Sequence, residues 1–209
     1  MLLYETAIIS GVFAGVIAVA ITRLIEILGG IVGGVLGTLP TTIVMATIGF
    51  WSTLSTSEFR SAMYIVPLGM LIDGGVLACW RYIPELLTSR TNMAHRGVFA
   101  CTLTVSLLFW SALAGASYAL VEYGIAGNVN ATLYIGIGAL FFVIVLGLVL
   151  SAYGRGAPKG SRPVTWVVLG IRGIGAGAVI FGTVYLGTTS SIAAGLFSTF
   201  PIIFTTTVM

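Results

Sequence analysis

Apolar residues run along this chain in long blocks, and short polar segments separate them. A helix needs about 20 apolar residues to cross the hydrocarbon core of a bilayer. Seven blocks approach or exceed that length: 7–28, 31–51, 62–80, 97–121, 133–153, 164–186 and a last one from residue 190 onward. The pattern predicts an all-α integral membrane protein, a polytopic bundle of about six to seven transmembrane helices.

Composition supports the same fold class. Hydrophobic residues make up 58% of the 209 positions and charged residues only 7%, whereas soluble domains carry about a quarter charged residues. There are too few charges to cover a water-soluble globule, so the bilayer is expected to solvate most of the chain. The N-terminus has no basic segment before its first apolar block and no small-residue cleavage site, so this block is expected to remain as a helix.

Basic residues gather in two connecting segments. They are Arg81, Arg90 and Arg96 after the third block, and Arg155, Lys159 and Arg162 after the fifth. Two crossings separate these segments, so both are expected on one side of the membrane. The positive-inside rule makes that side cytoplasmic or equivalent and puts the N-terminus on the other side. The charges indicate orientation and contact with anionic lipid rather than nucleic-acid binding.

A repeat is visible in the second and last blocks. The stretch GGIVGGVLGTLP, residues 29–40, aligns without a gap with SSIAAGLFSTFP, residues 190–201. Four residues recur identically: Ile31, Gly34, Thr38 and Pro40 as Ile192, Gly195, Thr199 and Pro201. The other glycines become alanine or serine, so small size is retained.

A second pair of windows lies just upstream of the first pair. Residues 9–19 match residues 171–181, and each window keeps a GxxxG motif, Gly11 with Gly15 and Gly173 with Gly177. Two matches in the same order favour duplication over chance. Five crossings per copy would insert the second copy upside down, as in many secondary transporters. The division is then a first repeat at 1–153, a basic loop at 154–163 and the start of an incomplete second repeat at 164–209.

Glycines of the second block recur every four residues, so they share one side of a helix. They are Gly29, Gly33 and Gly37, with Gly30 and Gly34 beside them. Helices in lipid associate mainly by close van der Waals contact, which small residues permit. We expect these glycines, the two GxxxG motifs and Gly195 to pack helices together.

Pro40 would break the second helix and free backbone carbonyls there. Thr38, Thr41 and Thr42 place hydroxyls around this break, and Thr199 does so in the second copy. Two readings remain open: the hydroxyls bond back to their own helix and bend it, or they help to bind a cation or small polar solute near the midplane.

Two ionisable residues lie deep within apolar blocks, where such residues are costly. Asp73, in the third block, is the first candidate for a coupling-ion or proton ligand. Arg172, in the sixth block, is a possible structural partner of opposite charge. Arg23 and Glu26, three residues apart, are expected to pair at the interface.

Two functions are consistent with these features. One is a transporter-type protein that moves a small solute or ion by alternating access. The alternative is a non-catalytic, transporter-derived subunit that packs into a larger membrane complex, or a homo-oligomer, and contacts lipid. The intramembrane Asp73 and Arg172 favour the first function, and the end of the second copy at Met209 favours the second. The sequence has no nucleophile elbow, phosphate-binding loop or metal-ligand spacing, so no enzyme activity, cofactor or metal site is predicted.

Overall fold

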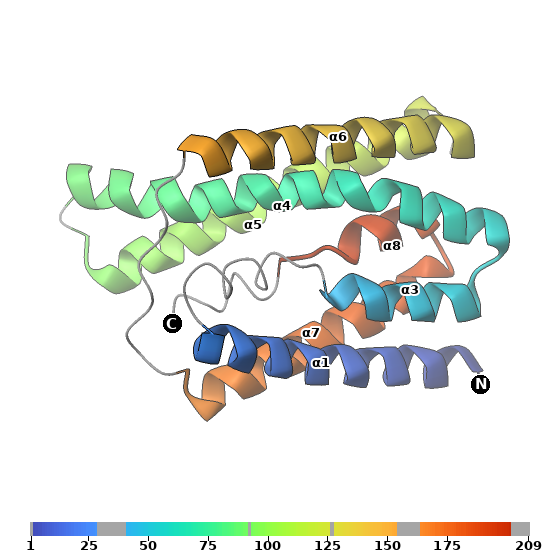
Figure 1. Ribbon diagram of the computed structural model, residues 1–209, viewed down its shortest axis with the longest axis horizontal. Helices are drawn as coiled ribbons and strands as arrows, with labels where there is room; N and C mark the ends of the chain where they lie inside the picture. Colours follow the sequence, from blue (N-terminus) through green and yellow to red (C-terminus); the bar gives the residue numbers. More distant parts are fainter. Residues whose placement is uncertain (1, 29–40, 92, 126–127, 154–163, 202–209) are drawn as a thin grey trace.

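The computed structural model describes residues 2–28, 41–91, 93–125, 128–153 and 164–201, and over these residues it contains helices and no strand (Figure 1). The helices are α1 (Leu2–Leu28), α3 (Thr41–Thr53), α4 (Thr56–Arg90), α5 (His95–Ala119), α6 (Val129–Tyr153), α7 (Trp166–Gly187) and α8 (Ser191–Phe197). A π-helical turn, η1 (Leu120–Gly124), continues α5. The predicted all-α fold is confirmed.

Within the described residues, five helices are long and apolar enough to cross a membrane: α1, α4, α5 with η1, α6 and α7. The protein is therefore an integral, multi-pass membrane protein. Helix α3 has 13 residues and α8 has seven, so these two helices alone are shorter than a crossing. Thr38, Pro40, the five glycines of 29–37 and the basic segment 154–163 lie outside the described residues.

Helix α4 is much longer than the block that predicted it. It has 35 residues and starts with a capping box, in which Ser55 Oγ accepts from Glu58 N at 3.4 Å and Ser55 N donates to Glu58 Oε2 at 2.9 Å. The prediction that Arg81, Arg90 and Arg96 lie in a loop was wrong, because Arg81 and Arg90 belong to α4 and Arg96 to the first turn of α5. Hydropathy marks where a helix leaves the apolar layer, and this helix continues beyond that point.

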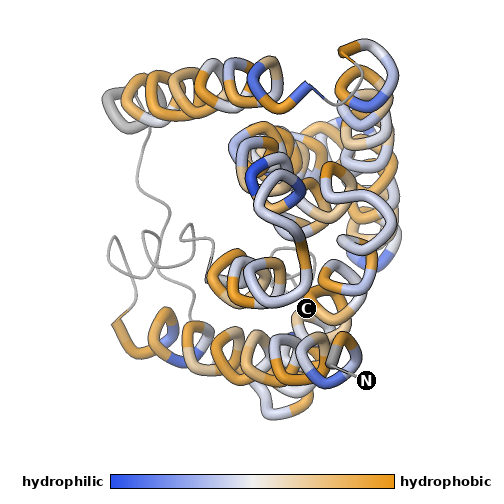
Figure 2. The backbone as a smooth tube through the Cα atoms, turned by 90° about the vertical axis from the view of Figure 1, so that its right-hand side faces the viewer, coloured by the Kyte–Doolittle hydropathy of each residue, from blue (hydrophilic) through white to orange (hydrophobic). Residues whose placement is uncertain are grey.

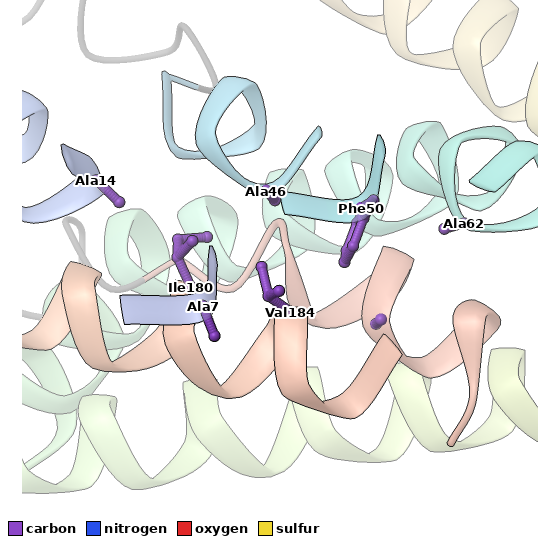
Figure 3. Close-up of a cluster of buried hydrophobic side chains, with 8 residues drawn as sticks. Ala7, Ala14, Ala46, Phe50, Ala62, Ile180 and Val184 are labelled. Carbon is purple, nitrogen blue, oxygen red and sulfur yellow. The ribbon is translucent and has the colours of Figure 1, made fainter. Parts of the chain in front are cut away.

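The helices form two groups (Figure 1). In the first group, α1 and α3 pack on α7 and on each other; in the second, α5 and α6 pack on α4. Small side chains dominate the core of the first group, which also includes Ala62 of α4, and Figure 3 shows Ala7, Ala14 and Ala46 there with Ile180 and Val184. Close helix packing therefore holds this group together.

Helix α8 lies between the two groups and contacts both, through α7 and α4. Ala194 belongs to the core of the first group, while Ile192 and Leu196 belong to a second core with α4 and α5. The junction between the helix groups is therefore built around α8.

The ends of the helices alternate as a multi-pass topology requires. The α4–α5 connection, the end of α6 and the start of α7 lie at one end of the bundle, and the N-terminus lies at the other (Figure 1). Hydrophobic residues cover most turns of the helices, including faces turned away from the bundle (Figure 2). Phe141 of α6 and Ile174 of α7, for example, are 69% and 77% exposed, as expected for side chains that meet lipid.

Candidate functional site

Asp73 lies in the middle of α4 and is hydrogen-bonded to a neighbouring helix. Trp110 of α5 donates its indole N–H to Asp73 Oδ1, with Nε1 and Oδ1 3.1 Å apart. The Trp110 side chain is buried, whereas Asp73 is half-buried. A carboxyl group at this depth is costly unless it has hydrogen-bond partners, and the indole of Trp110 is one such partner. Trp110 was not identified from the sequence as a partner of Asp73.

The Trp110 ring also contacts the end of α8. Its centroid lies 5.2 Å from that of Phe197 and 4.8 Å from that of Phe200, and both contacts are edge-to-face. This geometry is favourable for aromatic pairs. Trp110 therefore contacts both Asp73 of α4 and the end of α8. A displacement of Asp73 or of the end of α8 would change the position of the Trp110 ring and so affect the other.

The segment after α8 is seated directly on α4. A Cβ atom added at Gly69, one helical turn before Asp73, would overlap the Thr199 side chain. A Cβ atom added at Gly195 would likewise overlap the Ala62 carbonyl oxygen of α4. Glycine at these two positions lets α8 and Thr199 approach the α4 backbone. Thr199, in the Thr-x-Pro sequence 199–201, thus lies against a residue one turn from Asp73.

The hydroxyl groups at this break bond back to α8. Ser198 Oγ donates to Gly195 O at 2.7 Å, and Thr199 Oγ1 donates to Leu196 O at 2.9 Å. This is the arrangement expected if the hydroxyls stabilise the end of their own helix. Of the other predicted threonines, Thr42 is half-buried near the start of α3, and the side chain of Thr41 lies outside the described residues.

Arg172 faces a different helix from Asp73. It is buried on α7, and its Nη1 donates to Thr22 Oγ1 of α1 at 3.4 Å. The Thr22 hydroxyl in turn donates to Ala18 O at 2.7 Å. The two deep charged residues therefore serve different contacts: Arg172 joins α1 to α7, and Asp73 joins α4 to α5.

The paired ends of α1 and α7 carry a second polar contact. The Arg23–Glu26 ion pair predicted from the sequence is confirmed, with Nη1 and Oε2 2.7 Å apart. Glu26 Oε1 also accepts from the backbone N–H of Val164 at 3.1 Å, and the Arg23 guanidinium stacks 4.5 Å from the Trp166 ring centroid. These contacts hold the end of α1 beside the start of α7.

The two GxxxG motifs meet face to face in the middle of this helix pair. A Cβ atom added at Gly15 would lie 2.7 Å from Gly173 O, and one added at Gly11 would lie 2.8 Å from Gly177 O. Since Gly11 faces the later glycine of α7 and Gly15 the earlier one, the helices run antiparallel. The backbones touch here, and no larger side chain fits without a shift.

No protein-family model matches the chain, and neither the curated proteins nor the solved structures include a significant match. The assignment of a site therefore depends on geometry. The strongest candidate site is the group formed by Asp73, Trp110 and the end of α8, because it contains an ionisable side chain within a membrane-spanning helix. We call this group the α8 junction.

Trp110→Phe tests the hydrogen bond at this junction. The substitution keeps a ring against Phe197 and Phe200 but leaves Asp73 Oδ1 without its indole donor. We expect the free energy of unfolding to fall by about 1–3 kcal/mol, the usual effect of leaving a buried acceptor unsatisfied. Trp51→Phe is the matched control, since Trp51 is 75% exposed, and it should change stability little. Equal thermal shifts for both variants would contradict a structural role for this bond.

Proposed function

We propose that this protein is a transporter-type membrane protein that moves a small solute or ion by alternating access, with Asp73 as the ion-binding or proton-binding group. The observation that carries the proposal is the α8 junction. An ionisable side chain in the middle of a membrane-spanning helix is hydrogen-bonded to an indole that also contacts the end of a short helix, α8, and the residue Phe200 that follows it. Broken helices beside an intramembrane charge at the meeting of two helix groups are typical of secondary transporters.

The division into two helix groups supports alternating access. Apart from α8, the strongest contact between the two groups among the described residues is the limited one between α3 and α4. The first group is held by backbone-to-backbone glycine contacts and is expected to move as one body. A change at Asp73 would be transmitted through Trp110 to α8, which packs on both groups.

The α1–α7 pair supports the proposed inverted repeat. In the sequence alignment Gly11 corresponds to Gly173 and Val19 to Phe181. A Cβ atom added at Gly11 would lie 3.3 Å from Phe181 Cβ, and one added at Gly173 would lie 2.9 Å from Val19 Cγ2. Exchanging each residue for its counterpart converts one contact into the other, the property of an interface with two-fold symmetry. The axis would lie in the membrane plane between the GxxxG motifs.

Ion jumps on membranes containing the purified protein test this function without knowledge of the substrate. Proteoliposomes adsorbed on a solid-supported membrane would be exposed to a step in Na⁺ concentration or in pH. We expect a transient current for one of the two ions, because binding at Asp73 moves charge within the membrane. No current with either ion, from protein shown to be folded, would contradict the proposal.

An accessory subunit is the second candidate, and α6 favours it. Only 17% of the most apolar part of α6 is buried, compared with 28–33% for the other long helices. Lipid or another membrane subunit would cover this face. Recovery of the protein from mild detergent only as part of a larger complex, with full activity of that complex after Asp73→Asn, would favour the second candidate over transport.

A further inference from the structure

Two buried polar atoms without a hydrogen-bond partner lie on the interface between α4 and α5. They are Ser106 Oγ and Trp80 Nε1, and among the described residues the only other such atom is Thr183 Oγ1 of α7. Buried polar groups in folded proteins are nearly always satisfied, and an orphaned one commonly marks a bound water. Two of the three orphans therefore fall on the interface that also contains Asp73.

Their positions form a row with Asp73. Thr102, Ser106 and Trp110 are four residues apart, so they share the buried face of α5. On α4, Asp73 and Trp80 are seven residues apart and also share a face. The helices run antiparallel, since Trp110 bonds to Asp73 while the earlier Phe99 stacks on Trp80, with ring centroids 5.7 Å apart.

Ser106 thus lies between the levels of Asp73 and Trp80. A rise of 1.5 Å per residue puts Ser106 roughly 6 Å from the Trp110 level and Trp80 roughly 10 Å from the Asp73 level. Each of these separations is too long for a direct hydrogen bond and corresponds to one or two bridging water molecules. The row runs from Asp73 toward the end of the bundle where α4 ends at Arg90 and α5 begins at His95.

The described helices that pack on α4 bring no charged residue to the level of Asp73. Helices α3, α6 and α8 contain no Asp, Glu, Lys, Arg or His, and in α5 and η1 these residues are His95 and Arg96 at the start of α5 and Glu122 in η1. The other titratable side chains of α4, α5, η1 and α6 are cysteine thiols and tyrosine phenols, and the nearest charged residue along α4 is Arg81, two turns away. A proton leaving Asp73 therefore has water, and no carboxylate or imidazole, as its next acceptor.

We infer that water bound between α4 and α5 bridges Ser106 and Trp80 to Asp73, and that this row is the path by which the Asp73 carboxyl exchanges its proton. The carboxyl O–H bond breaks as the proton passes to the adjacent water, a proton moves on from that water toward bulk solvent, and the reverse transfer restores the acid. The inference rests on the proposed role of Asp73 and names the proton as the ion and the α5 N-terminal end as its entrance.

Infrared spectroscopy of the purified protein in lipid tests this path. The carboxyl C=O band of Asp73, identified by its loss in Asp73→Asn, shifts when H₂O is replaced by D₂O. We expect Ser106→Ala and Trp80→Phe each to slow this shift by about tenfold, the effect of one lost hydrogen bond along the path. Thr183→Val is the matched control, because it removes a buried orphan hydroxyl from α7, and it should leave the exchange rate unchanged.

Unaltered exchange in both Ser106→Ala and Trp80→Phe would overturn the inference, and so would the absence of any Asp73 carboxyl band in acid. Thermal unfolding of each variant shows whether it is folded, and Ser106→Cys provides a second, more conservative change at the serine. The proposed function is tested separately, by the ion-jump current of Asp73→Asn. If exchange is slowed in Ser106→Ala and Trp80→Phe while Asp73→Asn still gives a normal current, the water path is retained and the transport role of Asp73 is contradicted.

Discussion

Gly177→Val should destabilise the protein by disrupting the contact between α7 and α1. The new side chain would begin 2.9 Å from the Gly11 carbonyl oxygen of α1, and backbone atoms on both sides leave little room to adjust. Overpacking of this kind costs about 1–3 kcal/mol. For a chain of this size each kcal/mol corresponds to roughly 2–4 °C in the midpoint of thermal unfolding, which fluorescence-detected melting in detergent would measure.

Gly182→Val is the matched control for this change. Gly182 lies on the same helix, is exposed, and has no atom within 4 Å of an added Cβ. Both substitutions have the same effect on helix propensity, so their difference isolates the contact with α1. If Gly182→Val lowered the unfolding temperature as much as Gly177→Val, the α1–α7 contact would not be the source of stability.

Asp73→Asn should abolish the ion-jump current that we expect of the unmodified protein. Asparagine keeps an oxygen that can accept from Trp110 Nε1, so the fold and the α8 junction should survive. It has no negative charge and cannot exchange a proton, so the charge movement should fall to the level of protein-free vesicles. Solid-supported membrane recording, with orientation and amount of protein matched by immunoblot, would measure the loss.

Glu85→Gln is the control for loss of a carboxylate from the same helix. Glu85 is exposed near the end of α4 and is far from Trp110 and α8. It should give currents like those of the unmodified protein. A full current from Asp73→Asn, or an equal loss in both variants, would contradict a specific role for Asp73.

The fold class could be predicted from the sequence because hydropathy reports directly which residues lipid can solvate. Each long helix overlaps one predicted block, and the boundaries of α7 differ from it by two residues or fewer. Helix ends outside the apolar layer could not be predicted in this way. The last 10 residues of α4, including Glu85 and Arg90, are polar enough to resemble a loop, and nothing in their hydropathy indicates that the helix continues.

The candidate site was only partly accessible to sequence reasoning. Asp73 and the Thr199 break were each found because charge and proline are unusual within apolar blocks. Their proximity depends on Gly69 and Gly195, whose importance lies in what approaches them, and the sequence does not contain that information. Trp110 was missed as a partner because an indole in an apolar block is ordinarily a packing residue, and 37 positions separate it from Asp73.

The proposed alternating access requires the two helix groups to change their relative position with the protonation state of Asp73. Spin labels at Phe141→Cys of α6 and Ile174→Cys of α7, two exposed positions, would report the distance between the groups by pulsed electron paramagnetic resonance. Cys79 and Cys101, both free thiols, would first be replaced by alanine. We expect the distance distribution in lipid to change between acidic and alkaline buffer and to remain fixed in Asp73→Asn. The same distance distribution in acidic and alkaline buffer for the protein that retains Asp73 would contradict alternating access by this protein.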